Sequence, residues 1–224
     1  MTDQAKLLTL LQISDTTFPT GAFGFSGGFE RLIGDGWVST PQDLQRILLD
    51  DVLPRWFEFD RFYVRHSHRS FGQLDALREL DEECDAQMYM PALRDASLTT
   101  GRGILTSHAK RGTTGAGDIL SELRAGGLLG HAAIVQGMVG SALDLDEQVT
   151  EVGALHGVVM SHVSAAVRLG TLGALEALPL LAAAASAAAE HMAQPLPDSP
   201  RSFAPFLEIA ANRKAQNGAQ LFAN

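Results

Sequence analysis

Apolar residues recur at helical spacing along almost the whole chain, and the pattern is clearest between residues 146 and 170. One stripe in this segment consists of Val149, Val152, His156, Val159, Val163 and Val167. Steps of three and four residues place these side chains on one face of an α-helix. The pattern therefore predicts a helix that buries this face, and it favours a core histidine over a metal ligand at His156.

The same predicted helix carries a second stripe with small side chains. It holds Gly157, Ser161, Ser164 and Arg168. Small residues allow the backbone of a neighbouring element to come close. We therefore expect another helix to cross this one near Gly157.

Capping and breaking residues divide the rest of the chain into further helices. Thr40 followed by Pro41 and Asp43 is typical of a helix start, Pro54 is expected to kink or end that helix, and Asp118 is expected to cap another. We expect further helices within residues 7–11, 71–86, 91–105, 172–192 and 203–213. Because no strand-like alternation occurs, we predict an all-α fold: a single-domain helical bundle of about eight to ten helices with a flexible C-terminal tail.

Composition excludes several classes of function. The 224 residues contain 17 Lys and Arg against 26 Asp and Glu, a net charge of −9 that argues against a nucleic-acid partner. The single cysteine, Cys84, excludes an internal disulfide and any zinc site built on several thiolates. The longest apolar stretch, residues 177–189, is too short to span a bilayer, and the N-terminus lacks the features of a signal peptide. We expect a soluble, cytoplasmic protein without a membrane partner.

Motifs that would carry catalysis are missing. The Gly-rich segment 112–117 has no Lys after its last glycine, no G-x-S-x-G elbow occurs, and no two of the seven histidines have the H-E-x-x-H spacing. The acidic segment 75–85 is most simply a solvated helix face. On these grounds we expect neither an enzyme nor a tightly bound metal within one chain.

One segment near the N-terminus has a more specific pattern. Residues 11–30 include the run FPTGAFGFSGGFE, and four further stretches follow it in order. These are residues 93–97 with 101–102, residues 130–137 (GHAAIVQG), residues 161–170 (SHVSAAVRLG), and residues 207–210 with 221–222. Together they closely resemble the signature of the urease accessory protein UreF family, and the resemblance covers nearly the whole chain.

The resemblance implies an all-α homodimer that acts as a non-catalytic scaffold and chaperone in urease maturation. Members of this family bridge the accessory protein UreD, also called UreH, and the GTPase UreG, and they help to insert nickel into the urease apoprotein. We therefore expect nickel in transit through the complex and no cofactor bound stably. Residues 1–206 are expected to form the helical domain, and residues 207–224 to form a C-terminal partner-binding segment.

The resemblance also suggests which residues contact partners. The candidates are Glu30, Arg168, Leu207, Ile209, Arg213, Leu221 and Phe222. Alternatives stay open for several of them, because Glu30 and Arg168 are equally suited to an internal ion pair, and Gly27 with Gly28 to a close helix crossing. His131 and His162 are candidates for the wall of a nickel route, although ordinary helix-surface histidines explain them as well.

Two other functions are compatible with the sequence. In the first, the chain is a GTPase-activating protein for UreG that supplies an arginine, with Arg213 or Arg168 as the candidate. In the second, it is a helical regulator unrelated to nickel.

Overall fold

The computed structural model describes residues 2–15, 17–21 and 28–213, and these residues form helices and contain no strand. The helices are α1 (Asp3–Ser14), α2 (Phe29–Gly34), a continuous run of α3 (Pro41–Ile47), η2 (Leu48–Val52), α4 (Leu53–Arg55), η3 (Trp56–Asp60) and α5 (Arg61–Arg69), then α6 (Leu74–Gln87), α7 (Pro91–Arg111), α8 (Ala116–Ala125), α9 (Ala132–Ala142), α10 (Glu147–Arg168), α11 (Ala177–Met192) and α12 (Pro205–Asn212). Counting the continuous run as one helix gives ten, so the predicted all-α bundle is confirmed.

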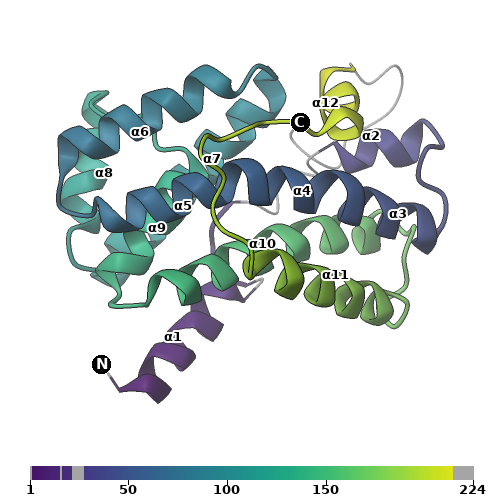
Figure 1. Ribbon diagram of the computed structural model, residues 1–224, viewed down its shortest axis with the longest axis horizontal. Helices are drawn as coiled ribbons and strands as arrows, with labels where there is room; N and C mark the ends of the chain where they lie inside the picture. Colours follow the sequence, from purple (N-terminus) through teal and green to yellow (C-terminus); the bar gives the residue numbers. More distant parts are fainter. Residues whose placement is uncertain (1, 16, 22–27, 214–224) are drawn as a thin grey trace.

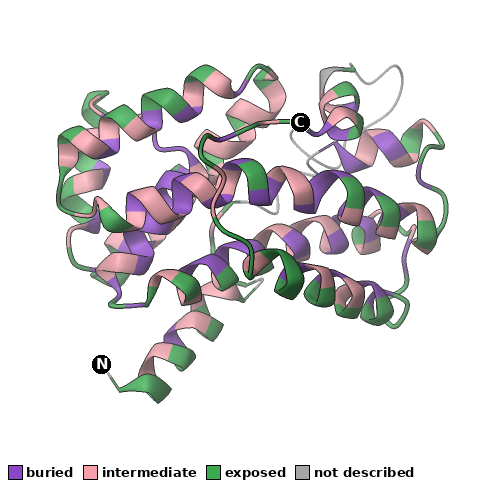
Figure 2. Ribbon diagram, viewed as in Figure 1, coloured by how far each residue is buried: buried purple, intermediate pink, exposed green. Residues whose placement is uncertain are grey.

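Helix α9 lies at the centre of the bundle, between α5, α7 and α10 (Figure 1). It is mostly buried, and two glycines let its neighbours approach (Figure 2). A Cβ atom on Gly137 would lie 2.2 Å from the carbonyl oxygen of Val64 on α5, and one on Gly140 would lie 2.2 Å from Oγ1 of Thr150 on α10. The closest helix crossings therefore lie on α9.

Helix α7 makes close contacts with two loops through its own glycines. A Cβ on Gly101 would lie 2.0 Å from the carbonyl oxygen of Gly130, and one on Gly103 would lie 2.0 Å from that of Thr20. Three of the stretches that carry the family resemblance thus meet at α7. Their glycines are explained by packing, because a side chain at either position would push the loop away.

Pro54 does not end the helix in which it lies. The helical run continues from Pro41 to Arg69, with one π-helical turn just before α4 and another just after it. In the first, the N–H of Leu53 bonds to the carbonyl oxygen of Leu48, which is the i to i−5 pattern of a π turn. Of the predicted kink or end at Pro54, the end does not occur, because the backbone takes up the proline within widened turns and stays helical. The predicted start is confirmed, since Thr40 and Asp43 form a capping box.

Helix α10 forms where a helix was predicted, but its burial and its crossing point differ from the prediction. His156 is exposed, and Val152 is 47% exposed, so the N-terminal half of the valine stripe is not buried. No atom of the described residues lies within 4 Å of a Cβ built on Gly157, whereas one on Gly153 would lie 2.7 Å from Cδ1 of Leu10 on α1. Both predictions are corrected: His156 is not a core residue, and α1 approaches at Gly153, one turn before Gly157.

Helix α8 begins before the predicted cap at Asp118. Gly126 closes it in the left-handed conformation, while its first residue is Ala116 and its N-cap is Gly115 rather than Asp118. Asp118 instead lies in the first turn, where its negative charge interacts favourably with the helix dipole.

Among the described residues, no helix is long and apolar enough to cross a membrane.

Candidate functional site

Helix α12 presents an apolar surface to solvent on the side of the molecule where it packs beside α2 (Figure 1). Phe206 is 40% exposed and Ile209 is 50% exposed, and they lie three residues apart on one helix face. The ring of Trp37, itself 41% exposed, contacts the ring of Phe206 edge-on at 5.8 Å between centroids. We call Trp37, Phe206 and Ile209 the α12 patch. Contiguous exposed apolar groups of this kind mark interaction sites more often than isolated ones.

The opposite face of α12 is anchored in the core. Leu207 and Ala210 are buried, and the buried carboxylate of Asp51 accepts the N–H of Leu207 at 3.0 Å. Burial raises the pKa of Asp51, although the N–H of Leu207 opposes the shift. Gly28 has a φ of +90° and admits the carbonyl oxygen of Leu207, which a Cβ at that position would meet at 3.1 Å. This glycine therefore serves a tight turn and a close helix crossing, and α12 is held rigidly.

The other predicted contact residues surround α12 unevenly. Arg213 follows the helix, is 48% exposed and pairs with Asp35 of the α2 C-cap, which also pairs with Arg31. Glu30 is half-buried on α2, and Arg168 is exposed as the last residue of α10. Helix α2, which carries Glu30, packs against both α10 and α12 and so lies between these two helices. Leu221 and Phe222 lie outside the described residues, as does the flexible tail predicted from residue 214.

His131 and His162, the two histidines proposed for a nickel route, occupy separate environments. His131 is fully buried, with Nε2 donating to Asp85 at 2.9 Å and Nδ1 lying 3.1 Å from the hydroxyl of Ser97. Arg94 pairs with the same carboxylate. Burial alone would raise the pKa of Asp85, but the hydrogen bonds from Arg94 and His131 outweigh it and hold that pKa below its ordinary value.

A carboxylate on α6 holds the loop that carries His131. The buried side chain of Asp81 accepts the backbone N–H groups of Leu129, Gly130 and His131 at 2.7–3.0 Å. Three donors converging on one carboxylate fix the loop before α9 begins. The surroundings of His131 are those of a structural residue whose polar atoms are already occupied.

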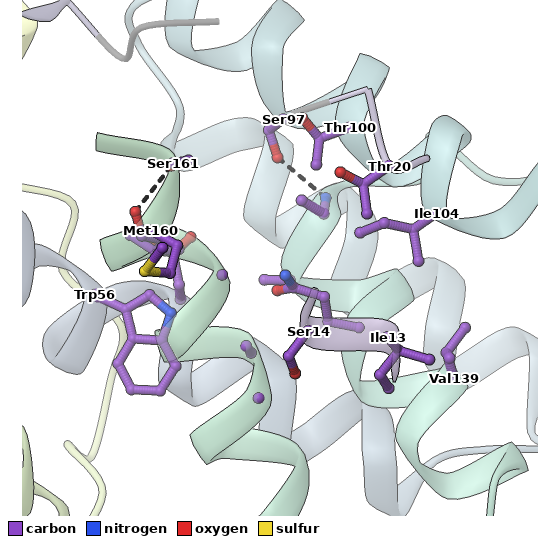
Figure 3. A pocket seen from close by; sticks show the side chains of 18 of the residues that line it. Ile13, Ser14, Thr20, Trp56, Ser97, Thr100, Ile104, Val139, Met160 and Ser161 are labelled. Carbon is purple, nitrogen blue, oxygen red and sulfur yellow. Dashed lines mark hydrogen bonds between the residues drawn. The ribbon is translucent and has the colours of Figure 1, made fainter. Parts of the chain in front are cut away.

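His162 lies on the wall of a cavity of about 270 Å³ that α1, α7, α9, α10 and the helical run near Trp56 enclose (Figure 3). Its Nδ1 donates to the carbonyl oxygen of Val158 at 2.8 Å, and its ring contacts Phe29 of α2. Burial lowers the pKa of His162 to about 4, so the imidazole is neutral at pH 7. The wall of the cavity is mostly apolar.

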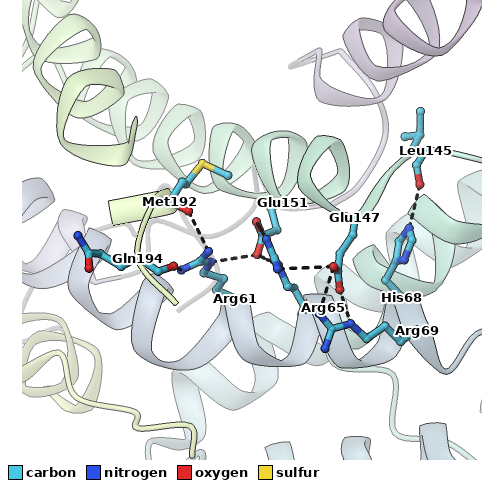
Figure 4. Close-up of polar contacts among 9 residues, drawn as sticks. All are labelled: Arg61, Arg65, His68, Arg69, Leu145, Glu147, Glu151, Met192 and Gln194. Carbon is cyan, nitrogen blue, oxygen red and sulfur yellow. Dashed lines mark hydrogen bonds and ion pairs between the residues drawn. The ribbon is translucent and has the colours of Figure 1, made fainter. Parts of the chain in front are cut away.

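A second charged cluster joins α5 to α10 (Figure 4). Glu151 is 1% exposed and pairs with both Arg61 and Arg65, and Glu147 pairs with Arg65 and Arg69. Arg61 also donates to the carbonyl oxygens of Met192 and Gln194, which fastens the segment after α11. Every charge in this network has an opposite partner, which is the arrangement expected of a structural cluster.

The described residues contain no group of three or more His, Cys, Asp and Glu side chains placed to hold a metal ion. Cys84 is buried on α6, and burial raises the pKa of its thiol, as do the nearby carboxylates of Asp60 and Asp81. The thiolate is therefore disfavoured at neutral pH.

Sequence reasoning missed two features of this region. Trp37 and Phe206 are far apart in the chain, and no periodic pattern links them. The exposure of Phe206 beside the burial of Leu207 was detectable as an amphipathic pattern in residues 203–213, but which face is buried depends on α2. The cavity left no sequence signal, because its lining residues come from segments spread along the chain from α1 to α12.

Comparisons with known proteins agree with these observations. A model of the UreF family matches residues 38–185. The urease accessory protein UreF of Trichodesmium erythraeum is 28% identical over 99% of this chain and 98% of its own length. Its counterpart in Corynebacterium efficiens is 30% identical over 99% of this chain and 98% of its own length, and that in Mycobacterium tuberculosis is 35% identical over 79% and 76%.

These relatives are named for an accessory role, which agrees with the expectation that the chain is not an enzyme. The family model covers well over half of the chain, and two of the relatives extend over nearly all of it, so the match includes both the helical bundle and α12. The chain belongs to the UreF family of urease accessory proteins.

Proposed function

We propose that this chain is a cytoplasmic, non-catalytic scaffold that bridges UreG and UreD during the insertion of nickel into the urease apoprotein. The observation that carries the proposal is the α12 patch, an exposed apolar surface on a helix whose opposite face is fixed in the core. A scaffold needs such a surface, because association derives its main driving force from apolar area removed from water.

The patch is the proposed docking site for UreD. Ile209 and Phe206 offer two partly exposed side chains on one rigid helix face, so little ordering is required of them on binding. Leu207, which the sequence also suggested as a contact, is buried in the core on the opposite face of α12 from the patch. Leu221 and Phe222, which lie outside the described residues, are proposed to extend the contact.

UreG is proposed to bind a composite surface of a homodimer that includes Arg168. Helix α1 supports self-association on a different side, because Leu7, Leu8 and Leu11 are each more than half exposed on a helix that projects from the body (Figure 1). Nickel is proposed to pass between the partners without a tight site in this chain. His131 is poorly placed for weak contact with nickel, because both of its ring nitrogens are already engaged.

A matched pair of substitutions tests the docking site. Ile209→Asp places a charge in the α12 patch, and Leu178→Asp places the same charge at a residue of α11 that is 58% exposed. We expect both variants to fold, since both positions face water. Ile209→Asp should lose UreD in a pull-down and lower nickel-dependent activation of urease in vitro, whereas Leu178→Asp should retain both. Equal UreD capture by the two variants would reject the patch as the docking site.

Truncation after Arg213 tests the tail separately, because it removes Leu221 and Phe222 and leaves α12 in place. Weaker UreD binding is the expected result. Arg168→Lys and Arg213→Lys distinguish the alternative role as a GTPase-activating protein, since a lysine cannot reproduce the two parallel hydrogen bonds of an arginine. A scaffold keeps the GTP turnover of each assembled complex, and only a catalytic arginine loses it. Arg213 is already paired with Asp35, which favours the scaffold.

A further inference from the structure

The cavity beside Trp56 extends along two helices. It follows α10 from Thr150 to Ser161, a span of about 16 Å at the rise of an α-helix, and it follows α7 from Leu93 to His108. Its volume of about 270 Å³ corresponds to roughly nine groups the size of a water molecule, at about 30 Å³ each. The space therefore suits an extended small molecule.

Few ionisable groups line the cavity, and they carry no net positive charge. Arg55 pairs with Asp60 at 2.6 Å, and both residues lie on the wall. Burial lowers the pKa values of His108 and His162 to about 4, so both are neutral at pH 7. Asp15 is exposed and adds a negative charge. An anion would therefore enter without a compensating charge.

Three polar atoms of the wall have no hydrogen-bond partner among the described residues: the hydroxyl oxygen of Thr150 and two nitrogen donors, on Trp56 and Arg55. Trp56 is 1% exposed, and its indole nitrogen has no acceptor among the residues that the structure describes. The same holds for Nε of Arg55, the preceding residue. Figure 3 shows the indole nitrogen on the edge of the ring that faces Ser14 and Ile13 across the cavity. The nitrogens of Trp56 and Arg55 can only donate, so a group that hydrogen-bonds to either of them must be an acceptor.

We propose that this cavity is a binding site for an uncharged, mainly apolar molecule that carries one carbonyl oxygen, which accepts the indole N–H of Trp56. Arg55 supplies a second donor on the same turn. An alkylammonium cation offers no acceptor to the N–H of Trp56, and an anion is disfavoured because Asp60 already neutralises Arg55. Water is the competing occupant. The site is separate from the α12 patch.

Intrinsic fluorescence provides the test, because the chain has two tryptophans and Trp56 lines the cavity. The Trp37→Phe protein leaves Trp56 as the only reporter. Titration with 2-octanone should give a saturable change in emission, with affinity rising about fourfold for each added methylene until the space is filled. Octanoate and octylammonium, of equal chain length, should bind at least tenfold more weakly.

Two glycine variants provide the control. Gly157 lines the cavity and has no atom within 4 Å of a built Cβ, so Gly157→Leu should fold and fill part of the space. Gly117 on α8 is equally open but does not line the cavity. We expect Gly157→Leu to abolish ketone binding and Gly117→Leu to preserve it. Capture of UreD should be unchanged in both, which keeps this test independent of the proposed scaffold role.

The hydrogen bond is tested by Trp56→Phe, read by calorimetry. Loss of one neutral hydrogen bond predicts a three- to tenfold lower affinity for 2-octanone, because the apolar contacts remain. The proposal is overturned if no ketone binds saturably, which would mean that the cavity holds only water. It is also overturned if octylammonium binds as well as the ketone, or if Gly157→Leu leaves binding intact.

Discussion

The crossing of α5 and α9 at Gly137 yields the sharpest prediction of stability. A Cβ at this position would lie 2.2 Å from the carbonyl oxygen of Val64 and 2.9 Å from the backbone nitrogen of His68. Both obstacles are backbone atoms of α5, which cannot rotate aside. Gly137→Ala therefore requires the two helices to separate by about 1.2 Å before the nearest backbone contact reaches the ordinary 3.4 Å.

The expected magnitude follows from two opposing effects. Overpacking a well-packed core costs about 1–3 kcal/mol, and the upper part of that range applies when backbone must move. Replacing a helical glycine by alanine returns about 0.5–1 kcal/mol. The net loss is about 2 kcal/mol, and a chain of this length changes its Tm by about 2–4 °C per kcal/mol. Gly137→Ala should therefore lower the Tm by about 4–8 °C.

Gly157→Ala is the matched control. It makes the same change in a helix interior, but no atom lies within 4 Å of the new Cβ, so only the gain in helix propensity remains. Its Tm should rise by about 1–4 °C. Differential scanning calorimetry of the two variants and the parent chain measures both shifts. If the two alanines shift the Tm in the same direction, the contact at Gly137 is not the constraint described here.

Three further predictions concern buried polar groups. Asp81→Ala leaves three backbone donors unpaired and should cost about 3 kcal/mol, with faster hydrogen exchange of the amides of residues 129–131 as the specific readout. The pKa of His108 is lowered to about 4 by burial, so the unfolded chain takes up a proton near pH 6.5 and the folded one does not. The free energy of unfolding should therefore fall by up to about 3 kcal/mol between pH 7 and pH 4, and His108→Gln should flatten that slope in urea titrations. Glu151→Ala leaves the buried Arg61 without a carboxylate partner and Arg65 with Glu147 alone, and should cost about 3–5 kcal/mol. Arg69→Ala, at a side chain that is 52% exposed, should cost under 1 kcal/mol.

Local patterns predicted the helices well because helix formation depends on near neighbours. The valine periodicity located α10, and the Thr40, Pro41 and Asp43 combination located the start of α3. The ends of α7 and α8 coincide with glycines in the left-handed conformation, Gly112 and Gly126. Capping side chains and glycines act over three or four residues, so their effect is visible in the chain itself.

Predictions that depended on what covers a helix face were less successful. His156 follows the valine spacing and is nevertheless exposed, because α1 covers α10 at Gly153 and leaves that turn open. Pro54 follows the usual rule for a helix breaker, yet π turns on both sides keep the run helical. A periodic stripe identifies a face but not its neighbour, and the neighbour is chosen by packing across the whole bundle.

The order of amino acids was enough to determine an all-α chain, its helices, and through its specific runs its membership of the UreF family. The three-dimensional packing alone determined the α12 patch, the occupied nitrogens of His131 and the cavity beside Trp56. The physical reason is one of range. Backbone hydrogen bonds in a helix link residues four apart, whereas burial and exposure are set by side chains that meet only after distant helices have packed.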